Sequence, residues 1–257
     1  MRLVGDLWIP VTYGERLFHK VYEVTGMGLG VNNDIESGID FLVSPARFTE
    51  FVQLAAAIEV FLRVIRLAKQ SCDDAPHIEP KSLANKIVRE IELPYHFTKD
   101  ASFGELAKRA AEVSRKSERD KPAVENIVYK SSPNQCYLCG EELTNAGRTK
   151  RTIEHIWPHA LGGETTPGNL VPACEDCNNS RGNPVTWAWG PVQSTYESHS
   201  KTSQPPNKEI RHSLAMAKIM LLASKPIGKK RQSLKEAIEK SRPVIPKLPI
   251  KVNQHYV

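Results

Sequence analysis

The sequence contains no apolar run of the ~20 residues that a membrane-spanning helix requires, and it shows no internal repeat or low-complexity tract. Its first residues, MRLVGDLWIP, are interrupted by Asp6 and lack the long apolar core of a signal peptide. We therefore expect a cytoplasmic protein with no membrane partner. Hydrophobic residues make up 40% and charged residues 25% of the 257 positions, which is typical of a globular protein with one or two domains.

Cysteine is also scarce, but four of the five cysteines form two tight pairs. Cys136 and Cys139 are separated by two residues, and so are Cys174 and Cys177. In a cytoplasmic protein such pairs indicate metal binding before disulfides, and four thiolates favour one tetrahedral structural zinc ion. Redox-active or simply buried cysteines are the alternative. Cys72 stands apart, and we expect it to be a small buried side chain.

Positive charge is concentrated near the C-terminus of the chain, whose formal net charge is +6. Residues 201–257 contain thirteen lysines and arginines against three acidic residues, which is a net charge of +10, so the preceding residues carry −4. A basic surface attracts phosphate backbones. The segment therefore either contacts DNA or is a solvated charged tail.

The first 121 residues are expected to form a mostly helical α+β region. Residues 1–43 mix β-branched and aromatic residues with glycines, which is typical of short strands and turns. Ser44 and Pro45 resemble a helix N-cap and first helical position. Apolar residues spaced by three and four then predict a helix to about Gln70 and helices over 82–92 and 103–119. Pro122 is expected to mark a domain boundary.

A polar linker over 200–207 is expected to precede two C-terminal helices, at 208–224 and 233–240. The final residues contain Pro243, Pro246 and Pro249, which favour extended or disordered chain. We accordingly divide the protein into a possible partner-binding or regulatory region, a cysteine-containing module and a basic helical extension, at 1–121, 122–200 and 201–257.

The residues between and after the cysteine pairs form a second pattern. Glu154 and His155 are followed by Ile-Trp-Pro, a Gly-Gly turn and an Asn-Leu at Asn169, and Asn178 and Arg181 follow the last cysteine. Over about residues 128–184 this order resembles the HNH endonuclease family in its zinc-bound form. The resemblance implies an α+β fold class, with a central ββα-metal, treble-clef-like zinc module between the helical N-terminal and basic C-terminal regions.

The resemblance also assigns roles. His155 matches the general base that activates water, a task suited to an imidazole that is neutral near pH 7. Glu154 and Asn178 match the ligands of a catalytic cation. Asn169 matches the residue that braces the loop and orients the histidine, and Arg181 is expected near the scissile phosphate. Carboxylate and amide oxygens suit hard ions, so we expect Mg²⁺ or Mn²⁺ there in addition to the structural Zn²⁺.

Structural alternatives exist for these residues. The two matched asparagines could be only a turn residue and a helix cap, and Asn183 is a rival amide ligand one turn further along. His159 could face phosphate or solvent. Trp187 and Trp189 alternate by two, as in a strand with both indoles on one face. They either pack against the module or stack on a base.

The expected function is a metal-dependent endonuclease that hydrolyses DNA. The family is similar to bacterial restriction and anti-phage defence nucleases, so we expect the effector of such a system, with a partner protein or a second copy of the chain. This role follows from resemblance alone. The alternatives are an inactive zinc-stabilised module that binds nucleic acid and a nuclease directed at RNA. The presence of Glu154, His155 and Asn178 together favours an enzyme.

Overall fold

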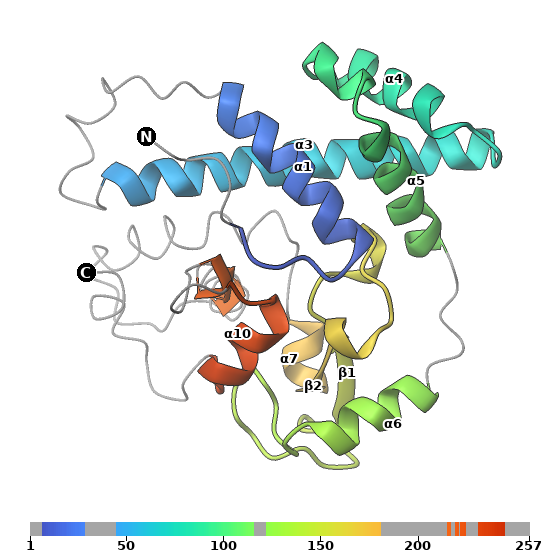
Figure 1. Cartoon of the computed structure of the whole chain (residues 1–257). Coiled ribbons are helices and arrows are strands. Elements are labelled where there is room, and N and C mark those ends of the chain that lie inside the picture. Colours follow the sequence, from blue (N-terminus) through green and yellow to red (C-terminus); the bar gives the residue numbers. More distant parts are fainter. Residues whose placement is uncertain are drawn as a thin grey trace.

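The computed structural model describes residues 7–28, 45–115, 122–180, 215–216, 219–220, 222–224 and 231–244. Helices dominate the described residues before the first cysteine pair (Figure 1): α1 (Tyr13–Gly28), α3 (Pro45–Asp74), α4 (Pro80–Ile91), α5 (Ala101–Arg115) and α6 (Pro122–Ser131), with the 3-10 turn η2 (Tyr95–Thr98). None of the helices in these ranges is long and apolar enough to cross a membrane.

The cysteine-rich module is built on one antiparallel hairpin followed by a short helix. Strand β1 (Arg151–His155) pairs with β2 (Leu170–Cys174), and α7 (Glu175–Asn179) follows directly. Two 3-10 turns, η3 (His159–Leu161) and η4 (Pro167–Asn169), lie in the loop that joins the strands. Helix α10 (Leu234–Ser241) lies beyond the module in the chain. The order β1-β2-α7 is the ββα arrangement that the sequence predicted, and the α+β fold class is confirmed.

Helix α1 contradicts the short strands predicted within residues 1–43. Its buried residues Leu17, Phe18 and Val21 recur at helical spacing. The β-branched and aromatic residues favour strands, but the burial of one face of α1 outweighs this intrinsic preference. A helix-start signal was present in Thr12 and Glu15, which form a capping box.

Other boundaries shift by a few residues. Helix α3 continues to Asp74 rather than ending near Gln70, and α4 and α5 each begin two residues earlier than predicted. Pro122 is the first residue of α6, a helix that the sequence analysis missed. Proline is favoured at that position because its missing N–H has no helical partner there. The prediction for 208–224 falls largely outside the described residues, and α10 lies within one residue of its prediction.

The capping box of α1 is unusually buried. The Oε2 atom of Glu15 accepts hydrogen bonds from the backbone N–H groups of Thr12 (2.9 Å) and Val11 (3.1 Å), and Oε1 accepts one from the indole of Trp8 (2.8 Å). Burial raises the pKa of Glu15, while the bonds from Thr12, Val11 and Trp8 act in the opposite direction. These contacts fix the chain that enters α1.

The hydrophobic core is continuous between the helical region and the module. Trp157, two residues after His155, is 2% exposed. Its ring centroid lies 5.4 Å from that of Phe18, 5.6 Å from Phe61 and 6.2 Å from Trp8. Aromatic pairs at these separations attract beyond their area of burial. The helices therefore support the loop that follows β1, although the division at Pro122 stays a prediction.

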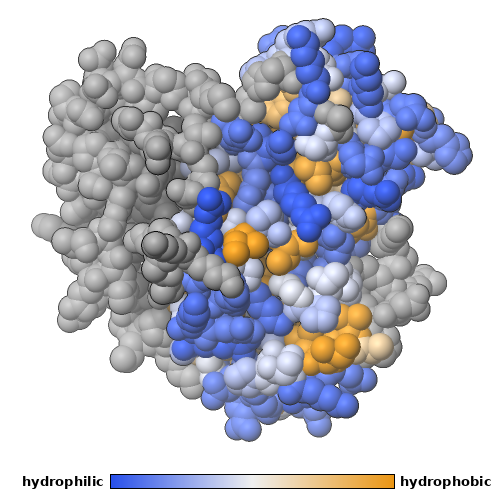
Figure 2. Space-filling view, in the orientation of Figure 1, coloured by the Kyte–Doolittle hydropathy of each residue, from blue (hydrophilic) through white to orange (hydrophobic). Residues whose placement is uncertain are grey.

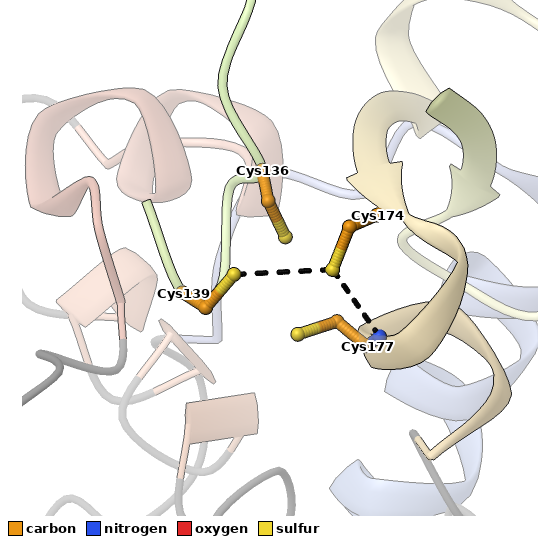
Figure 3. Close-up of side chains that lie close together, drawn as sticks. All are labelled: Cys136, Cys139, Cys174 and Cys177. Carbon is orange, nitrogen blue, oxygen red and sulfur yellow. Dashed lines mark hydrogen bonds between the residues drawn. The ribbon is translucent and has the colours of Figure 1, made fainter. Parts of the chain in front are cut away.

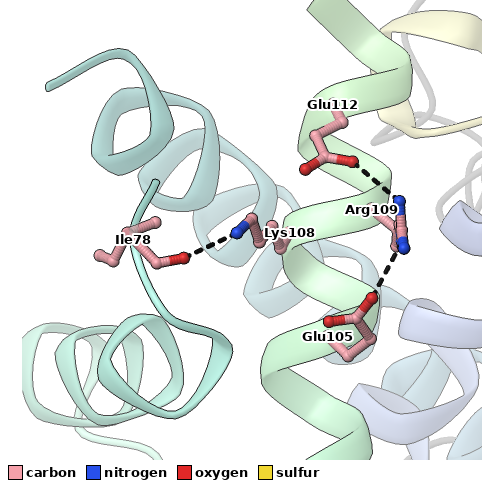
Figure 4. A network of polar contacts seen from close by, with 5 residues as sticks. All are labelled: Ile78, Glu105, Lys108, Arg109 and Glu112. Atoms are coloured by element: carbon pink, nitrogen blue, oxygen red, sulfur yellow. Dashed lines mark hydrogen bonds and ion pairs between the residues drawn. The ribbon is translucent and has the colours of Figure 1, made fainter. Parts of the chain in front are cut away.

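Helix α5 packs against α4 and against the η3 turn of the module. The Nζ of Lys108 donates to the backbone oxygen of Ile78 (2.9 Å), and Arg109 pairs with Glu105 (2.9 Å) and Glu112 (3.4 Å) (Figure 4). The Arg109 pairs are exposed, and such pairs add little stability. On the face shown in Figure 2 the described surface is mainly hydrophilic, with separate small hydrophobic groups. Stability on this side therefore comes mainly from the buried core.

Candidate functional site

The four paired cysteines converge on one point. Their Sγ atoms all lie within 4.8 Å of one another, and those of Cys139 and Cys174 are 3.9 Å apart (Figure 3). A tetrahedral zinc ion with Zn–S bonds of about 2.3 Å separates its sulfur ligands by about 3.8 Å. The observed spacing fits that geometry. Among the residues that the structure describes, this is the one cluster of three or more His, Cys, Asp or Glu ligand atoms.

Local backbone geometry positions both cysteine pairs. The N–H of Cys136 donates to Glu141 (2.8 Å), and the N–H of Gly140 donates to Cys136 (2.9 Å). Gly140 has a φ of 75°, which a glycine adopts at little cost and which turns the chain back after Cys139. Cys174 ends β2 and caps α7, where its sulfur accepts the N–H of Cys177 (3.4 Å). The second pair therefore lies at the start of α7.

The four thiols lie close enough to shift one another's pKa values. Contacts with the thiols of Cys136 and Cys139 raise the pKa of Cys177 far above its usual range, and contacts with Cys139 and Cys177 lower that of Cys136. A divalent cation would hold all four as thiolates, because metal binding displaces the protons. Cys72 is buried and lies outside the cluster.

His155 is the last residue of β1, where the strand leads into the loop containing η3. Its Nε2 lies 3.0 Å from the hydroxyl of Thr165, and its ring centroid is 5.6 Å from that of His159. Both imidazoles are partly exposed. The Thr165 contact fixes one ring nitrogen and thereby orients the imidazole. Thr165 carries no sequence signal beyond its place after the Gly-Gly turn.

Asn169 braces that loop through three hydrogen bonds. Its Oδ1 accepts the backbone N–H of Trp157 (2.7 Å), and its Nδ2 donates to the backbone oxygens of Trp157 (3.0 Å) and Glu164 (3.0 Å). The side chain is 1% exposed. The backbone oxygen of Asn169 also accepts the N–H of Ile156 (2.8 Å), next to His155. These bonds brace the loop, and the role of Asn169 in orienting His155 stays a prediction.

Glu154 and Asn178 lie on the same side of the hairpin. Alternate strand residues share a face, so Thr152 and Glu154 project from the same face of β1. The Nδ2 of Asn178 donates to the hydroxyl of Thr152 (3.2 Å), which places α7 against that face. Glu154 is 3% exposed and Asn178 is partly exposed. With Nδ2 engaged, Oδ1 of Asn178 is the atom that could ligate a cation.

The loop around η3 is joined to the first turn of α1, as Figure 1 shows. The carboxylate of Glu164 accepts the N–H of Tyr13 (2.8 Å), and the N–H of Gly14 donates to Gly162 (2.9 Å). A Cβ added to Gly14 would lie 2.1 Å from the backbone oxygen of Leu161. The sequence analysis missed these contacts because more than a hundred residues separate the two segments.

Several predicted site residues lie outside the described residues, namely Arg181, Asn183, Trp187 and Trp189. Most of the basic segment 201–257 and the predicted linker before it also lie outside them. Their suggested contacts with phosphate, bases or the module therefore stay predictions.

The hairpin, the following helix and the cysteine cluster define a ββα module with a candidate zinc site. A model of the HNH endonuclease family matches residues 136–188, about a fifth of the chain. This segment is an HNH endonuclease domain. No curated protein and no solved structure matches the chain.

Proposed function

We propose that the protein is a metal-dependent endonuclease that hydrolyses DNA phosphodiester bonds. The observation that supports this most directly is the placement of His155, which ends β1 within the matched HNH segment and is held by Thr165 at 3.0 Å. A positioned imidazole is the commonest general base in proteins. The buried bracing of the loop by Asn169 keeps that position fixed.

The chemistry that we assign to these residues is one hydrolytic step. His155 takes a proton from water on Nδ1, because its Nε2 faces Thr165. The water oxygen forms a bond to phosphorus, and the bond from phosphorus to the leaving oxygen breaks. Glu154 and Oδ1 of Asn178 would hold Mg²⁺ or Mn²⁺, which when bound stabilises negative charge on the phosphate and the leaving oxygen. Arg181 would contact the phosphate near the cleavage point.

The four cysteines would hold Zn²⁺ as a structural ion, separate from the catalytic one. Their spacing and donor type fit zinc, and such a site stabilises a module whose own core is small. Thiolates favour zinc and oxygen donors favour magnesium, so the two sites differ in preference.

The biological role belongs to the same proposal. We assign the protein to a bacterial defence or restriction system in the cytoplasm, with recognition supplied by a partner protein or a second copy of the chain. The support is the family resemblance, together with the general rule that phosphate contacts carry no sequence information.

Cleavage of supercoiled plasmid tests the enzyme. With Mg²⁺ or Mn²⁺ the wild type should nick or linearise DNA, and His155→Ala should lower the rate by about 10²–10⁴-fold. His77→Ala is the matched control, because His77 is exposed between α3 and α4 and should leave the rate unchanged. The same series on single-stranded RNA distinguishes an RNA nuclease. If the wild type cuts neither substrate and His155→Ala binds DNA as tightly as the wild type, the module only binds nucleic acid.

A further inference from the structure

Arg242 lies directly after α10 and is in an energetically unusual position. Its Nε, Nη1 and Nη2 atoms are all buried, and no hydrogen bond reaches any of them from the part of the chain that the structure describes. A buried charge is costly unless an opposite charge compensates it. A guanidinium retained in such a place therefore points to a nearby negative charge.

Contacts of the neighbouring residues place Arg242 beside the first cysteine pair. The N–H of Val244 donates to the backbone oxygen of Tyr137 (3.0 Å). On the other side, the Cβ of Pro243 lies 3.0 Å from the point that a Cβ on Gly140 would occupy. Residues 242–244 thus lie against the turn formed by residues 136–140.

Electrostatics within the described residues point to the same place. Burial lowers the pKa of Arg242, and the negative charges of Glu239, Cys136 and Tyr137 act against that decrease. The carboxylate of Glu239 is exposed and also lies 4.0 Å from Lys235. An exposed carboxylate is largely screened by water, so it does not account for a guanidinium whose nitrogens are buried.

A zinc ion with four thiolate ligands is a dianion. Three of the four cysteines here are buried, so water screens this excess charge poorly. We propose that Arg242 is the counter-charge of the zinc–thiolate cluster, supplied by the C-terminal segment from outside the matched HNH domain. This inference rests on the proposed zinc site.

The consequence is a less reactive metal centre. A positive charge beside thiolates lowers their nucleophilicity, so Arg242 should slow attack on the sulfurs by electrophiles and the zinc loss that follows. Removing this one charge should accelerate zinc release about tenfold. If Arg242 acted only through packing, neutral and positively charged replacements of it would release zinc at similar rates.

The test measures zinc release from the full-length protein treated with iodoacetamide, using a colorimetric zinc indicator. Each thiolate attacks the methylene carbon, an S–C bond forms and iodide leaves. Arg242→Met and Arg242→Gln should release zinc about tenfold faster than the wild type, whereas Arg242→Lys should stay within about twofold. Lys240→Met is the matched control, because it removes an exposed positive charge from the last turn of α10, two residues before Arg242, and should change nothing.

Elemental analysis before the assay separates the two proposals. A wild type without zinc rejects the zinc site itself. If zinc is present but the neutral variants release it at the wild-type rate, or Arg242→Lys releases it as fast as Arg242→Met, the counter-charge is wrong. If neither neutral variant folds, Arg242→Lys decides alone: a wild-type rate supports the proposal and a tenfold faster rate overturns it.

Discussion

The carboxylate of Glu164 accepts a 2.8 Å hydrogen bond from the backbone N–H of Tyr13, the first residue of α1. The next residue along the loop, Thr165, contacts His155. Two consecutive loop residues therefore make these contacts. Glu164 holds the start of α1, and Thr165 orients the proposed base His155. This arrangement gives the helical region a direct structural role at the candidate active site.

Glu164→Gln should loosen this connection while preserving the size of the side chain. A hydrogen bond to a charged acceptor contributes about 1.5–3 kcal/mol, so we expect the free energy of unfolding to fall by about 1–2 kcal/mol and the DNA cleavage rate to fall severalfold. Urea denaturation and plasmid cleavage measure the two effects. Glu112→Gln, at an exposed ion pair on α5, is the control and should alter neither. A variant at Glu164 as stable and active as the wild type would rule out the connection.

Gly14→Ala tests the close approach of α1 to the loop. The new Cβ would lie 2.1 Å from the oxygen of Leu161 and 2.4 Å from Nε1 of Trp157, so the two segments must separate. Overpacking of this kind costs about 1–3 kcal/mol. Gly168→Ala is the matched control in the loop that α1 contacts, because a Cβ added there would lie 3.9 Å from its nearest neighbour. Thermal unfolding of both variants should show a lower Tm for Gly14→Ala alone, and equal values would contradict the packing.

Cys174→Ser should abolish zinc binding and unfold the module, because the binding energy of a structural zinc ion is folding energy. Elemental analysis of the wild type should give about one zinc per chain. Cys72→Ser is the control, since Cys72 is buried in α3 and is not part of the cluster. It should keep its zinc, even if it loses some stability. A Cys174→Ser protein with a folded C-terminal half would show that zinc is not what holds the module together.

His19 should make the protein sensitive to mild acid. Burial, assisted by the charge of Arg231, lowers the pKa of His19 from 6.5 to about 3. Between these values the unfolded chain binds a proton that the folded protein does not. Stability from this group is therefore fully present above pH 6.5 and is lost as pH falls toward 3, by up to about 1.4 kcal/mol per pH unit.

Replacing the imidazole tests that dependence. His19→Phe should flatten the fall in the free energy of unfolding between pH 6.5 and about 4.5, a window set by the shift of His19 and by the usual carboxyl range. His77→Gln should leave the wild-type slope, because His77 is exposed between α3 and α4 and the substitution replaces no buried group. Urea denaturation at several pH values gives the slopes. The same slope in the wild type and His19→Phe would show that His19 is protonated in the folded protein.

The sequence predicted the parts of the fold that depend on local spacing. The paired cysteines and the long apolar repeat of α3 each leave a signal within a few residues, whereas the ββα order around Glu154 and His155 was implied by the resemblance to the HNH family. Helix α1 differs from the predicted strands because its β-branched and aromatic residues pack on one helical face, and its local sequence signal is the Thr12–Glu15 capping box. The contacts of Glu164 could not be predicted, since they depend on how α1 packs against a loop far along the chain.

The position of Trp157 also bears on how freely the HNH segment can be exchanged between proteins. Its ring lies among Trp8, Phe18 and Phe61, so the helical region supplies the apolar surroundings of the loop that follows β1. A gene fragment that encodes only residues 136–188 would leave that indole facing water. Residues 136–188 therefore depend on the helical region for the burial of Trp157. To bury Trp157 again in another protein, residues 136–188 would need a matching aromatic pocket there.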